Sequence, residues 1–513
     1  MSTPFLRWAN KWGLGTALLV IASNMPLTTR AAASPLYAPA GFVTTRGTAF
    51  ALDGAPFYFQ GTNAARFGTN SAESEADIYQ AMRVYASKGI RVVRLWGFSC
   101  KGAHWGEPII EWASTSGIGY NESGFRRLDA TLDAARAAGL KIILPLVNFE
   151  PEYCGIDWWT KQVIGSSDRQ QFYTDGRVQS AFRSYVQTLL SRINTRYEST
   201  LGRRLSYRDD PTIMAIEVMN EPHTQDYYEL NRGLPPGEIV FQFLSSIAAY
   251  IRSLDPNHLI CSGEEGYKTT TDATLDTFDH NWINNGSKGV NFEKNLTIKH
   301  LDFATVHVYP DNWNIPSSQF EWINPHFVQR RAALAHRAGK PIVMEEAGFS
   351  NDGNWHPQLG YYQSPAWYLS RMYDFANSAD YAGTLIWQAM PVGFKIGAYD
   401  YDFNHPVGDV VARQAAYMNS RSNFTPPSRP ENIDGVFVHC SAGSATDPDG
   451  DGWGWENGRS CHVEQFPRCS SSASDPDGDG WGWRMAVAAR SSCAVGRSRG
   501  CSGNEDGDSV VEI

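Results

Sequence analysis

Short apolar runs alternate with longer amphipathic segments along most of the chain. Apolar runs rich in branched residues are typical of strands that are buried on both faces of a parallel sheet. They predict eight strands, at 57–63, 91–98, 141–148, 213–220, 258–263, 302–309, 341–347 and 384–390. Helical periodicity predicts helices between them, among them 75–88, 123–138, 178–196, 238–254, 325–338 and 366–379. This alternation predicts the α/β class and, within it, a (β/α)8 TIM barrel.

The predicted barrel occupies residues 36–421. This span exceeds the roughly 250 residues of a bare barrel, so we expect long loops at its active face. Residues 422–439 are rich in proline and polar side chains, without periodicity, which is typical of a linker. A small tail rich in Cys, Asp, Gly and Trp follows, and its residues 440–483 contain the sequence DPDGDGWGW twice, with a period of 28 residues.

The first 33 residues have the pattern of a secretory signal peptide. Arg7 and Lys11 give a positively charged start, residues 13–23 are apolar, and three alanines at 31–33 offer a cleavage site. The apolar segment is too short to span a bilayer comfortably, and the sequence has no other candidate span. We therefore expect a secreted, extracellular protein that is not a membrane protein.

The net charge and the cysteine content of the chain limit which binding partners and which redox compartment are expected for the protein. The net charge of −10 gives no electrostatic footprint for nucleic acid, and we expect a monomer. Export permits disulfide bonds among the eight cysteines. Cys100 and Cys154 each follow a predicted strand end by a few residues, so they could pair, but buried free thiols are equally compatible with the sequence.

Carboxylates mark the ends of two predicted strands. The fourth strand ends at Asn220 and Glu221, because the proline that follows cannot continue the ladder. The seventh strand ends in Glu345 and Glu346. Barrel enzymes carry their chemistry at the carboxyl ends of the strands, and glycoside hydrolysis needs a pair of acids. The sequence therefore predicts a glycoside hydrolase.

Other polar and aromatic residues occupy the same strand ends. Arg94 lies inside an apolar strand, where it is costly unless a carboxylate pairs with it. His307 and Tyr309 share one face of the sixth strand because they are two residues apart. Each residue alone is more typical of packing or of a structural ion pair, but their common position favours catalysis. The remaining members of this set are Trp96, Asn148 and Trp387.

The barrel resembles glycoside hydrolase family 5, and most closely its endo-β-1,4-mannanase group. The resemblance covers nearly the whole barrel and implies a retaining hydrolase that needs no cofactor for catalysis. The matching segments are VRLWGFS (93–99), LVN (146–148), FYTD (172–175), DDPTI (209–213), MNEP (219–222), GEEG (263–266), DFATVHVYPD (302–311), EEAG (345–348) and GTLIWQ (383–388).

The resemblance assigns roles to the carboxylates. It implies that Glu221 is the acid/base, whose pKa must then be raised. It implies that Glu346 is the nucleophile, with Arg94 and Tyr309 stabilising its anion. Glu345 is one residue away and is expected to point to the other side of the strand, although it is the main competitor for the nucleophile role. In a retaining enzyme the two carboxyl groups should lie roughly 5–5.5 Å apart.

The resemblance also implies substrate contacts. Asn220 would bind the sugar 2-hydroxyl, a contact that strengthens in the transition state. His307 would orient the acid/base or a hydroxyl group, and Trp387 would stack under the sugar. Arg94, Tyr309, Trp96 and Asn148 complete the expected substrate-binding set.

Three departures from the mannanase pattern bear on the substrate. His223 stands where mannanases often have arginine, Ala347 follows the expected nucleophile instead of phenylalanine, and residues 149–155 replace a motif of asparagine and paired glycines. We predict a secreted retaining endo-β-1,4-mannanase that hydrolyses mannan, galactomannan or glucomannan by double displacement. The alternatives are an exo-β-mannosidase or a β-1,4-glucanase on the same fold and, from a different class, a non-catalytic carbohydrate-binding protein.

The tail repeats resemble the first half of a calcium loop, with carboxylates at alternate positions before glycine. The bidentate glutamate that closes such a loop is absent, so a weak Ca²⁺ site and a solvated acidic turn both fit. The tail also faintly resembles small family 10 cellulose-binding modules. The candidate metal ligands are Asp447, Asp449, Asp451, Asp475, Asp477 and Asp479.

The two repeats diverge abruptly after Trp483. Copy one continues with Glu-Asn-Gly-Arg-Ser-Cys and copy two with Arg-Met-Ala-Val-Ala-Ala. Deleting one base from a possible coding sequence of the first hexapeptide gives the second, at all six positions. We therefore predict that residues 484–513 are out-of-frame sequence without a selected structure.

Overall fold

The computed structural model describes residues 40–65, 67–68, 73–102, 108–113, 117–151, 154–224, 228–268, 281–351, 359–391, 397–424, 453–456 and 459–462. The chain divides into two units, Met1–Ser428 and Arg429–Ile513, and each is described by itself.

Eight parallel strands form the central sheet of the first unit, in the order β10-β9-β8-β5-β4-β13-β12-β11. The two outermost strands are joined where the N–H of Asp302 donates to the carbonyl of Ile260 at 2.8 Å, which closes the sheet into a TIM barrel. All eight predicted strands are confirmed. Their bounds are β4 (Phe59–Asn63), β5 (Val92–Arg94), β8 (Lys141–Pro145), β9 (Ile213–Glu217), β10 (Leu259–Cys261), β11 (Ala304–Val308), β12 (Ile342–Ala347) and β13 (Gly383–Ile386).

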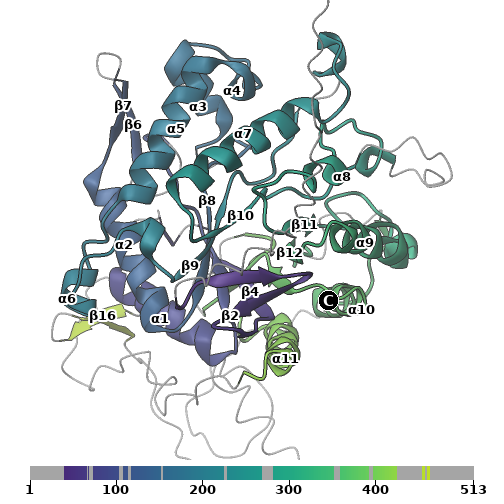
Figure 1. Cartoon of the computed structure of the whole chain (residues 1–513). Coiled ribbons are helices and arrows are strands. Elements are labelled where there is room, and N and C mark those ends of the chain that lie inside the picture. The colour runs from purple at the N-terminus through teal and green to yellow at the C-terminus, as the bar shows by residue number, and fades with distance from the viewer. Residues whose placement is uncertain are drawn as a thin grey trace, which may run out of the picture. The chain divides into compact units, whose positions relative to one another are not determined.

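Amphipathic helices surround this sheet (Figure 1). The predicted helices are confirmed, with the one at 178–196 ending earlier, at Ser191. The predicted helix at 325–338 begins with a π-helical turn, η6 (Asn324–Val328). The main helices are α1 (Glu75–Ser87), α2 (Glu122–Ala137), α5 (Gly176–Ser191), α7 (Glu238–Leu254), α9 (Gln329–Arg337), α10 (Pro365–Ser378) and α11 (Pro406–Arg421).

Local sequence explains where these helices begin and which side they bury. In α1, Ser74 and Asp77 form a capping box, in which each side chain bonds to the backbone N–H of the other. In α7, the buried residues include Ile239, Phe243 and Ile247, spaced by four, which is one helix face. That apolar face packs toward the barrel and leaves the polar face to solvent.

A small antiparallel sheet covers the amino-terminal end of the barrel. It consists of β1 (Val43–Arg46), β2 (Ala49–Leu52) and β3 (Ala55–Pro56), and a turn at Asp53 and Gly54 joins the last two. Phe50 and Phe57 pack here in one apolar cluster with Val92, Met214 and Val343 of the barrel strands. This end is a packed apolar plug, so the polar chemistry lies at the opposite end.

Loops at the carboxyl ends of the strands carry short elements. They are β6 (Ile110–Ala113), β7 (Gly117–Tyr120), α3 (Ile156–Ile164), α4 (Gln171–Thr174), η2 (Leu230–Arg232), η4 (Asn281–Ile283), α8 (Phe292–Asn295), η5 (Ser317–Trp322), β14 (Ala389–Met390) and β15 (Tyr401–Asp402). Two more short elements, α6 (Tyr197–Leu201) and η1 (Tyr207–Asp209), connect α5 to the start of β9. A disulfide bond between Cys100 and Cys154 links the loops after β5 and β8, which decides between the two alternatives that the sequence left open. Cys261 is a buried free thiol.

In the second unit, β16 (Trp453–Glu456) and β17 (Arg459–His462) form an antiparallel pair, and β16 begins within the last three residues of the first DPDGDGWGW repeat. The six candidate calcium ligands lie outside the described residues, as do the predicted signal peptide and residues 484–513. Within the described ranges, no helix is long and apolar enough to cross a membrane.

Candidate active site

Glu221 follows β9 in a strained backbone conformation. Its φ is 51°, in the left-handed region that residues other than glycine rarely adopt. Its N–H donates to the carbonyl of Gly263 at 2.8 Å. Gly263 is required there, because a Cβ would lie 2.1 Å from the carbonyl oxygen of Met219. Strain of this kind costs on the order of 1–3 kcal/mol and is concentrated at functional sites.

The Glu221 side chain pairs with a buried histidine. Nδ1 of His307 donates to Oε1 of Glu221 at 2.7 Å. Glu221 is 21% exposed and the imidazole is fully buried. The partly exposed carboxylate of Glu221 can therefore contact a ligand in the mouth of the barrel, while the buried imidazole of His307 fixes its position through the hydrogen bond.

Glu346 ends β12 opposite Glu221. Its Oε1 accepts from Nη1 of Arg94 at 2.5 Å, and its Oε2 accepts from the hydroxyl of Tyr309 at 2.5 Å. One oxygen of each of Glu221 and Glu346 and a ring nitrogen of His307 all lie within 4.8 Å of one another. The structure thus brings together the two predicted catalytic carboxylates and their three predicted polar partners.

Arg94 is also held by Asn220 and by two residues, Glu217 and Asn63, that were not among the predicted site residues. Its Nε and Nη2 each donate to one oxygen of Glu217, both at 2.6 Å. Nη2 further donates to Oδ1 of Asn220 at 2.6 Å, and Nη1 to Oδ1 of Asn63 at 3.0 Å. Glu217, like Arg94, is a charged residue inside a predicted apolar strand, so the same sequence pattern indicates a buried ion pair at both positions.

The prediction that Glu345 points away from the site is wrong. The pairing of β11 with β12 shifts by one residue after Val306, so that His307 lies opposite Glu346 and Glu345 is the extra residue of a bulge. The bulge breaks strict alternation of side chains. Glu345 is consequently fully buried within the cluster, with Oε1 3.7 Å from Nε of Arg94 and Oε2 3.6 Å from Nε2 of His307.

The electrostatics of the unliganded site differ from the expected raised pKa of Glu221. Burial raises the pKa of Glu221, but the hydrogen bond and positive charge of His307 outweigh it and leave the pKa below its ordinary value. Burial raises the pKa of Glu346, against the opposing charges of His307 and Arg94. The pKa of His307 is well above its ordinary value, because the surrounding carboxylates outweigh its burial. The proton of the unliganded pair therefore resides on His307.

The two predicted tryptophans have different surroundings. Trp387 is half-buried, whereas Trp96 is only 1% exposed and offers no face to a sugar, which corrects its predicted role as a substrate contact. The Trp96 ring packs between Phe98 and Trp387, at centroid distances of 5.5 and 5.9 Å. Trp96 therefore packs against Trp387 from within the core of the barrel wall.

The two predicted asparagines bind each other. Nδ2 of Asn220 donates to Oδ1 of Asn148 at 2.9 Å, and Asn148 is 3% exposed. With Oδ1 of Asn220 engaged by Arg94, one amide proton of Asn220 remains for a ligand. Asn148 thus holds the amide of Asn220 in one orientation.

Two of the three departures from the mannanase pattern, His223 and Phe149, meet beside Glu221. The rings of His223 and Phe149 lie 3.6 Å apart, and the guanidinium of Arg169 lies 4.1 Å from the Phe149 ring. Nδ1 of His223 lies 3.1 Å from the carbonyl oxygen of Glu221. Burial and the charge of Lys288 lower the pKa of His223 to about 3, so its imidazole is neutral.

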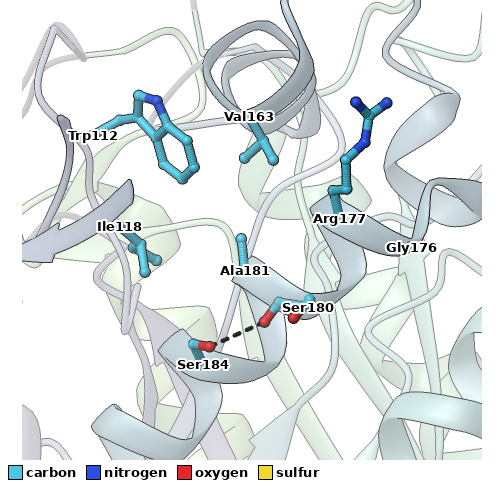
Figure 2. A pocket seen from close by; sticks show the side chains of 8 residues that line it. All are labelled: Trp112, Ile118, Val163, Gly176, Arg177, Ser180, Ala181 and Ser184. Atoms are coloured by element: carbon cyan, nitrogen blue, oxygen red, sulfur yellow. Dashed lines mark hydrogen bonds between the residues drawn. The ribbon is translucent and has the colours of Figure 1, made fainter. Parts of the chain in front are cut away.

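A hollow of about 560 Å³ lies between α5, α3 and the β6–β7 hairpin (Figure 2). It contains no carboxylate, and its one charged residue, Arg177, pairs with Asp175 at 2.8 Å. Its lining residues are Trp112, Ile118, Val163, Gly176, Arg177, Ser180, Ala181 and Ser184. None of them belongs to the predicted site, so the chemistry lies at the strand ends.

Two groups of side chains in the described part of the chain have the ligand types of a metal site. They are Glu221, His307 and Glu346, and, more deeply buried, Glu217, Cys261 and Glu345. In the first group His307 and Arg94 already donate to the carboxylates, and in the second Arg94 bonds directly to Glu217. In both groups, a positively charged side chain, His307 or Arg94, therefore already donates hydrogen bonds to the carboxylates.

Known proteins share this fold and this sequence. Residues 40–388 match the family described as GH family 5 beta-mannosidase-like. A probable mannan endo-1,4-beta-mannosidase F of Neosartorya fischeri is 32% identical over 61% of this chain and 62% of its own length. A probable mannan endo-1,4-beta-mannosidase A of Aspergillus flavus is 31% identical over 62% of this chain and 75% of its own. The match to the Neosartorya protein thus spans less than two thirds of that protein.

A solved structure agrees with these sequence matches. The endo-1,4-beta-mannanase of Rhizomucor miehei superposes with a TM-score of 0.62 at 27% identity, covering 74% of this chain and 99% of its own. The family match extends over more than half of the chain and includes both predicted catalytic carboxylates. The chain belongs to the β-mannosidase-like group of glycoside hydrolase family 5.

Proposed function

We propose that this protein is a secreted endo-β-1,4-mannanase that hydrolyses mannan-type polysaccharides with retention of configuration. The observation that carries the proposal is the closeness of Glu221 and Glu346, whose nearest oxygens lie within 4.8 Å. Retaining glycosidases place their carboxyls roughly 5–5.5 Å apart, whereas inverting enzymes need room for a water between them. The names of the sequence relatives support the choice of mannan.

In the first step, a carboxylate oxygen of Glu346 attacks the anomeric carbon of the sugar. The bond from that carbon to the leaving oxygen breaks, and Glu221 gives its proton to that oxygen. Arg94 and Tyr309 hold Glu346 with both oxygens hydrogen-bonded, which orients the attacking atom. In the second step, Glu221 takes a proton from water, the water oxygen bonds to the anomeric carbon, and Glu346 leaves as a carboxylate.

The proton for the first step comes from the His307–Glu221 pair. In the unliganded site it resides on His307, 2.7 Å from Oε1 of Glu221. A bound sugar removes water from around the carboxylate, and desolvation disfavours its charged form. The proton then moves along the existing hydrogen bond to Glu221, which becomes the acid that the reaction needs.

Substrate contacts follow from the same geometry. The free amide proton of Asn220 is available to the sugar 2-hydroxyl, and the half-buried Trp387 provides a stacking face. Substrate, water and side chains supply all groups used in the two steps, and no cofactor enters them. The Cys100–Cys154 disulfide supports an oxidising, extracytoplasmic compartment and so the export that the N-terminal sequence predicts.

The test is product analysis combined with rescue chemistry. We expect a spread of manno-oligosaccharides from linear mannan and galactomannan; mannose alone would indicate an exo-acting enzyme, and activity on carboxymethyl cellulose alone would indicate a glucanase. With added azide, Glu346→Ala should form an α-mannosyl azide and Glu221→Ala a β-mannosyl azide from an activated aryl mannoside. Rescue with the opposite configurations, or none in either variant, would overturn the assigned roles.

A further inference from the structure

We propose that Glu217 is a positioning residue for the reaction: it fixes the guanidinium of Arg94 and limits how much of its positive charge acts on Glu346. This inference rests on the proposed function, because it takes Glu346 as the nucleophile. Glu217 touches neither substrate nor reacting atoms and acts only through Arg94.

The geometry fixes Arg94 in one orientation. Glu217 accepts from Nε and Nη2 in two parallel bonds of 2.6 Å, an arrangement that sets the plane of the guanidinium. The third nitrogen, Nη1, is thereby directed at Glu346 Oε1, at 2.5 Å. Without this clamp, only the single bonds to Asn220 and Asn63 and the bond to Glu346 itself would oppose a rotation of the guanidinium that carries Nη1 away from the nucleophile.

Glu217 itself is immobilised. It is fully buried on β9, and Gly263 packs directly against it, since a Cβ on that glycine would lie 2.2 Å from Glu217 Oε1. The carboxylate therefore has no space into which it could swing. Glu217 lies on β9 and Glu346 on β12, and in the strand order these two strands are on opposite sides of β5, which carries Arg94.

The charges around Arg94 explain why a clamp matters. Its guanidinium lies within 4 Å of Glu217, Glu345 and Glu346, so one positive charge is shared among three carboxylates. Glu217 takes two of its bonds and reduces the stabilisation left for the anion of Glu346. A carboxylate that is held as too stable an anion is a weaker nucleophile.

Groups on every neighbouring element contribute to this balance. They are Arg94 of β5, Glu217 and Glu221 of β9 and its end, Cys261 of β10, His307 and Tyr309 around β11, and Glu345 and Glu346 of β12. Burial, together with the charge of Glu345, leaves the pKa of Glu217 above its ordinary value, although the charge of Arg94 opposes that rise. Burial also raises the pKa of the Cys261 thiol, which stays protonated.

The test isolates the nucleophile by using 2,4-dinitrophenyl 2-deoxy-2-fluoro-β-mannoside. Its leaving group needs no acid, so the inactivation rate reports the ionisation and reactivity of Glu346 alone. In Glu217→Gln we expect the acidic midpoint of the pH profile to fall by about one pH unit, because Arg94 acts more strongly on Glu346. We expect the maximal rate to fall roughly ten- to a hundred-fold, because Arg94 is no longer held in place.

Two further variants separate charge from position and from stability. Glu264→Gln is the matched control, since Glu264 is 3% exposed and accepts from Ser262 and Asn295 instead of Arg94. It should leave both the midpoint and the rate at wild-type values. Glu217→Asp keeps the charge but is too short for both bonds, so it should lower the rate without moving the midpoint; it also serves if Glu217→Gln does not fold.

A double-mutant cycle with Arg94→Lys tests whether Glu217 acts through Arg94. In the lysine background, Glu217→Gln should change the rate less than about three-fold. Full additivity, or a wild-type profile in Glu217→Gln with folding confirmed by circular dichroism, would overturn the inference. If instead the wild-type enzyme is not labelled at Glu346 by the fluorosugar, the proposed function itself fails.

Discussion

Nδ1 of His307 lies 2.7 Å from Oε1 of Glu221, and this pair links the acid/base to the rest of the carboxylate cluster. The same imidazole approaches Glu345 at 3.6 Å through Nε2 and Glu346 at 3.5 Å through Nδ1. One buried ring thus faces three carboxylates. The proton that it carries in the unliganded site is available to whichever carboxylate substrate binding makes most basic, and Glu221 is the nearest.

Replacing His307 with asparagine should affect substrates according to their leaving groups. The amide can still donate to Glu221 but stores no proton, so hydrolysis of mannan should fall roughly 10²- to 10³-fold. Hydrolysis of 2,4-dinitrophenyl β-mannoside, whose leaving group needs no proton, should fall by less than about ten-fold. Steady-state rates on both substrates measure the difference.

The matched control is His258→Asn, because His258 is also buried and also pairs with a carboxylate, Asp255, at 2.6 Å. That pair follows α7, away from the strand ends that carry the cluster. The control should lower stability without changing the ratio of the two rates. Equal losses on both substrates in His307→Asn would contradict the role in proton supply.

Trp387 should contribute to sugar binding through its exposed face. Trp387→Ala should lower kcat/KM on manno-oligosaccharides by roughly ten- to a hundred-fold, which corresponds to about 1–3 kcal/mol for a stacking contact. Trp367→Ala is the control, since Trp367 is 41% exposed on α10 and belongs to no part of the cluster. A similar loss in both variants would indicate a general effect on the fold.

The Cys100–Cys154 disulfide should stabilise the fold by closing a loop with a sequence separation of 54 residues. Loop-closure entropy for this length predicts a loss of about 4 kcal/mol in the free energy of unfolding when both cysteines are replaced by serine. Urea unfolding of the wild type, with and without reductant, measures this loss. Reductant should not further destabilise the double variant, and an unchanged wild type in reductant would contradict the bond.

His223 should make the protein less stable in acid. Its folded pKa is about 3, against an ordinary value of 6.5, because of burial and the charge of Lys288. Below pH 6.5 the unfolded chain takes up a proton that the folded chain does not, so the stability of the wild type falls as the pH drops toward about 3. Above pH 6.5 this group has no effect.

The comparison with His223→Gln isolates this effect from the other titrating groups. The difference in unfolding free energy between the wild type and the variant should be constant above pH 6.5 and should shift in favour of the variant at lower pH. Urea unfolding at several pH values between 4 and 8 would measure it. Parallel stability curves over the whole range would show that His223 is not held neutral.

The sequence by itself determined the barrel and the identity of its reactive end. Strands buried on both faces are continuous apolar runs, so all eight were predicted from hydrophobicity alone. A charge or an amide at the end of such a run is conspicuous, which identified Arg94, Asn220, Glu221 and Glu346. Because side chains alternate along a strand, the spacing of two residues placed His307 and Tyr309 on one face.

Only the tertiary structure decided how these groups are combined. The bulge that turns Glu345 into the cluster depends on the register between β11 and β12, which no local pattern encodes. The burial of Trp96 and the clamp of Glu217 on Arg94 depend on neighbours far away in the sequence. The direction of the pKa shift at Glu221 depends on His307, which contributes a charge at 2.7 Å from 86 residues away along the chain. Hydrophobic periodicity is a local property and can be read along the chain, whereas register, packing and charge balance arise only when distant segments meet.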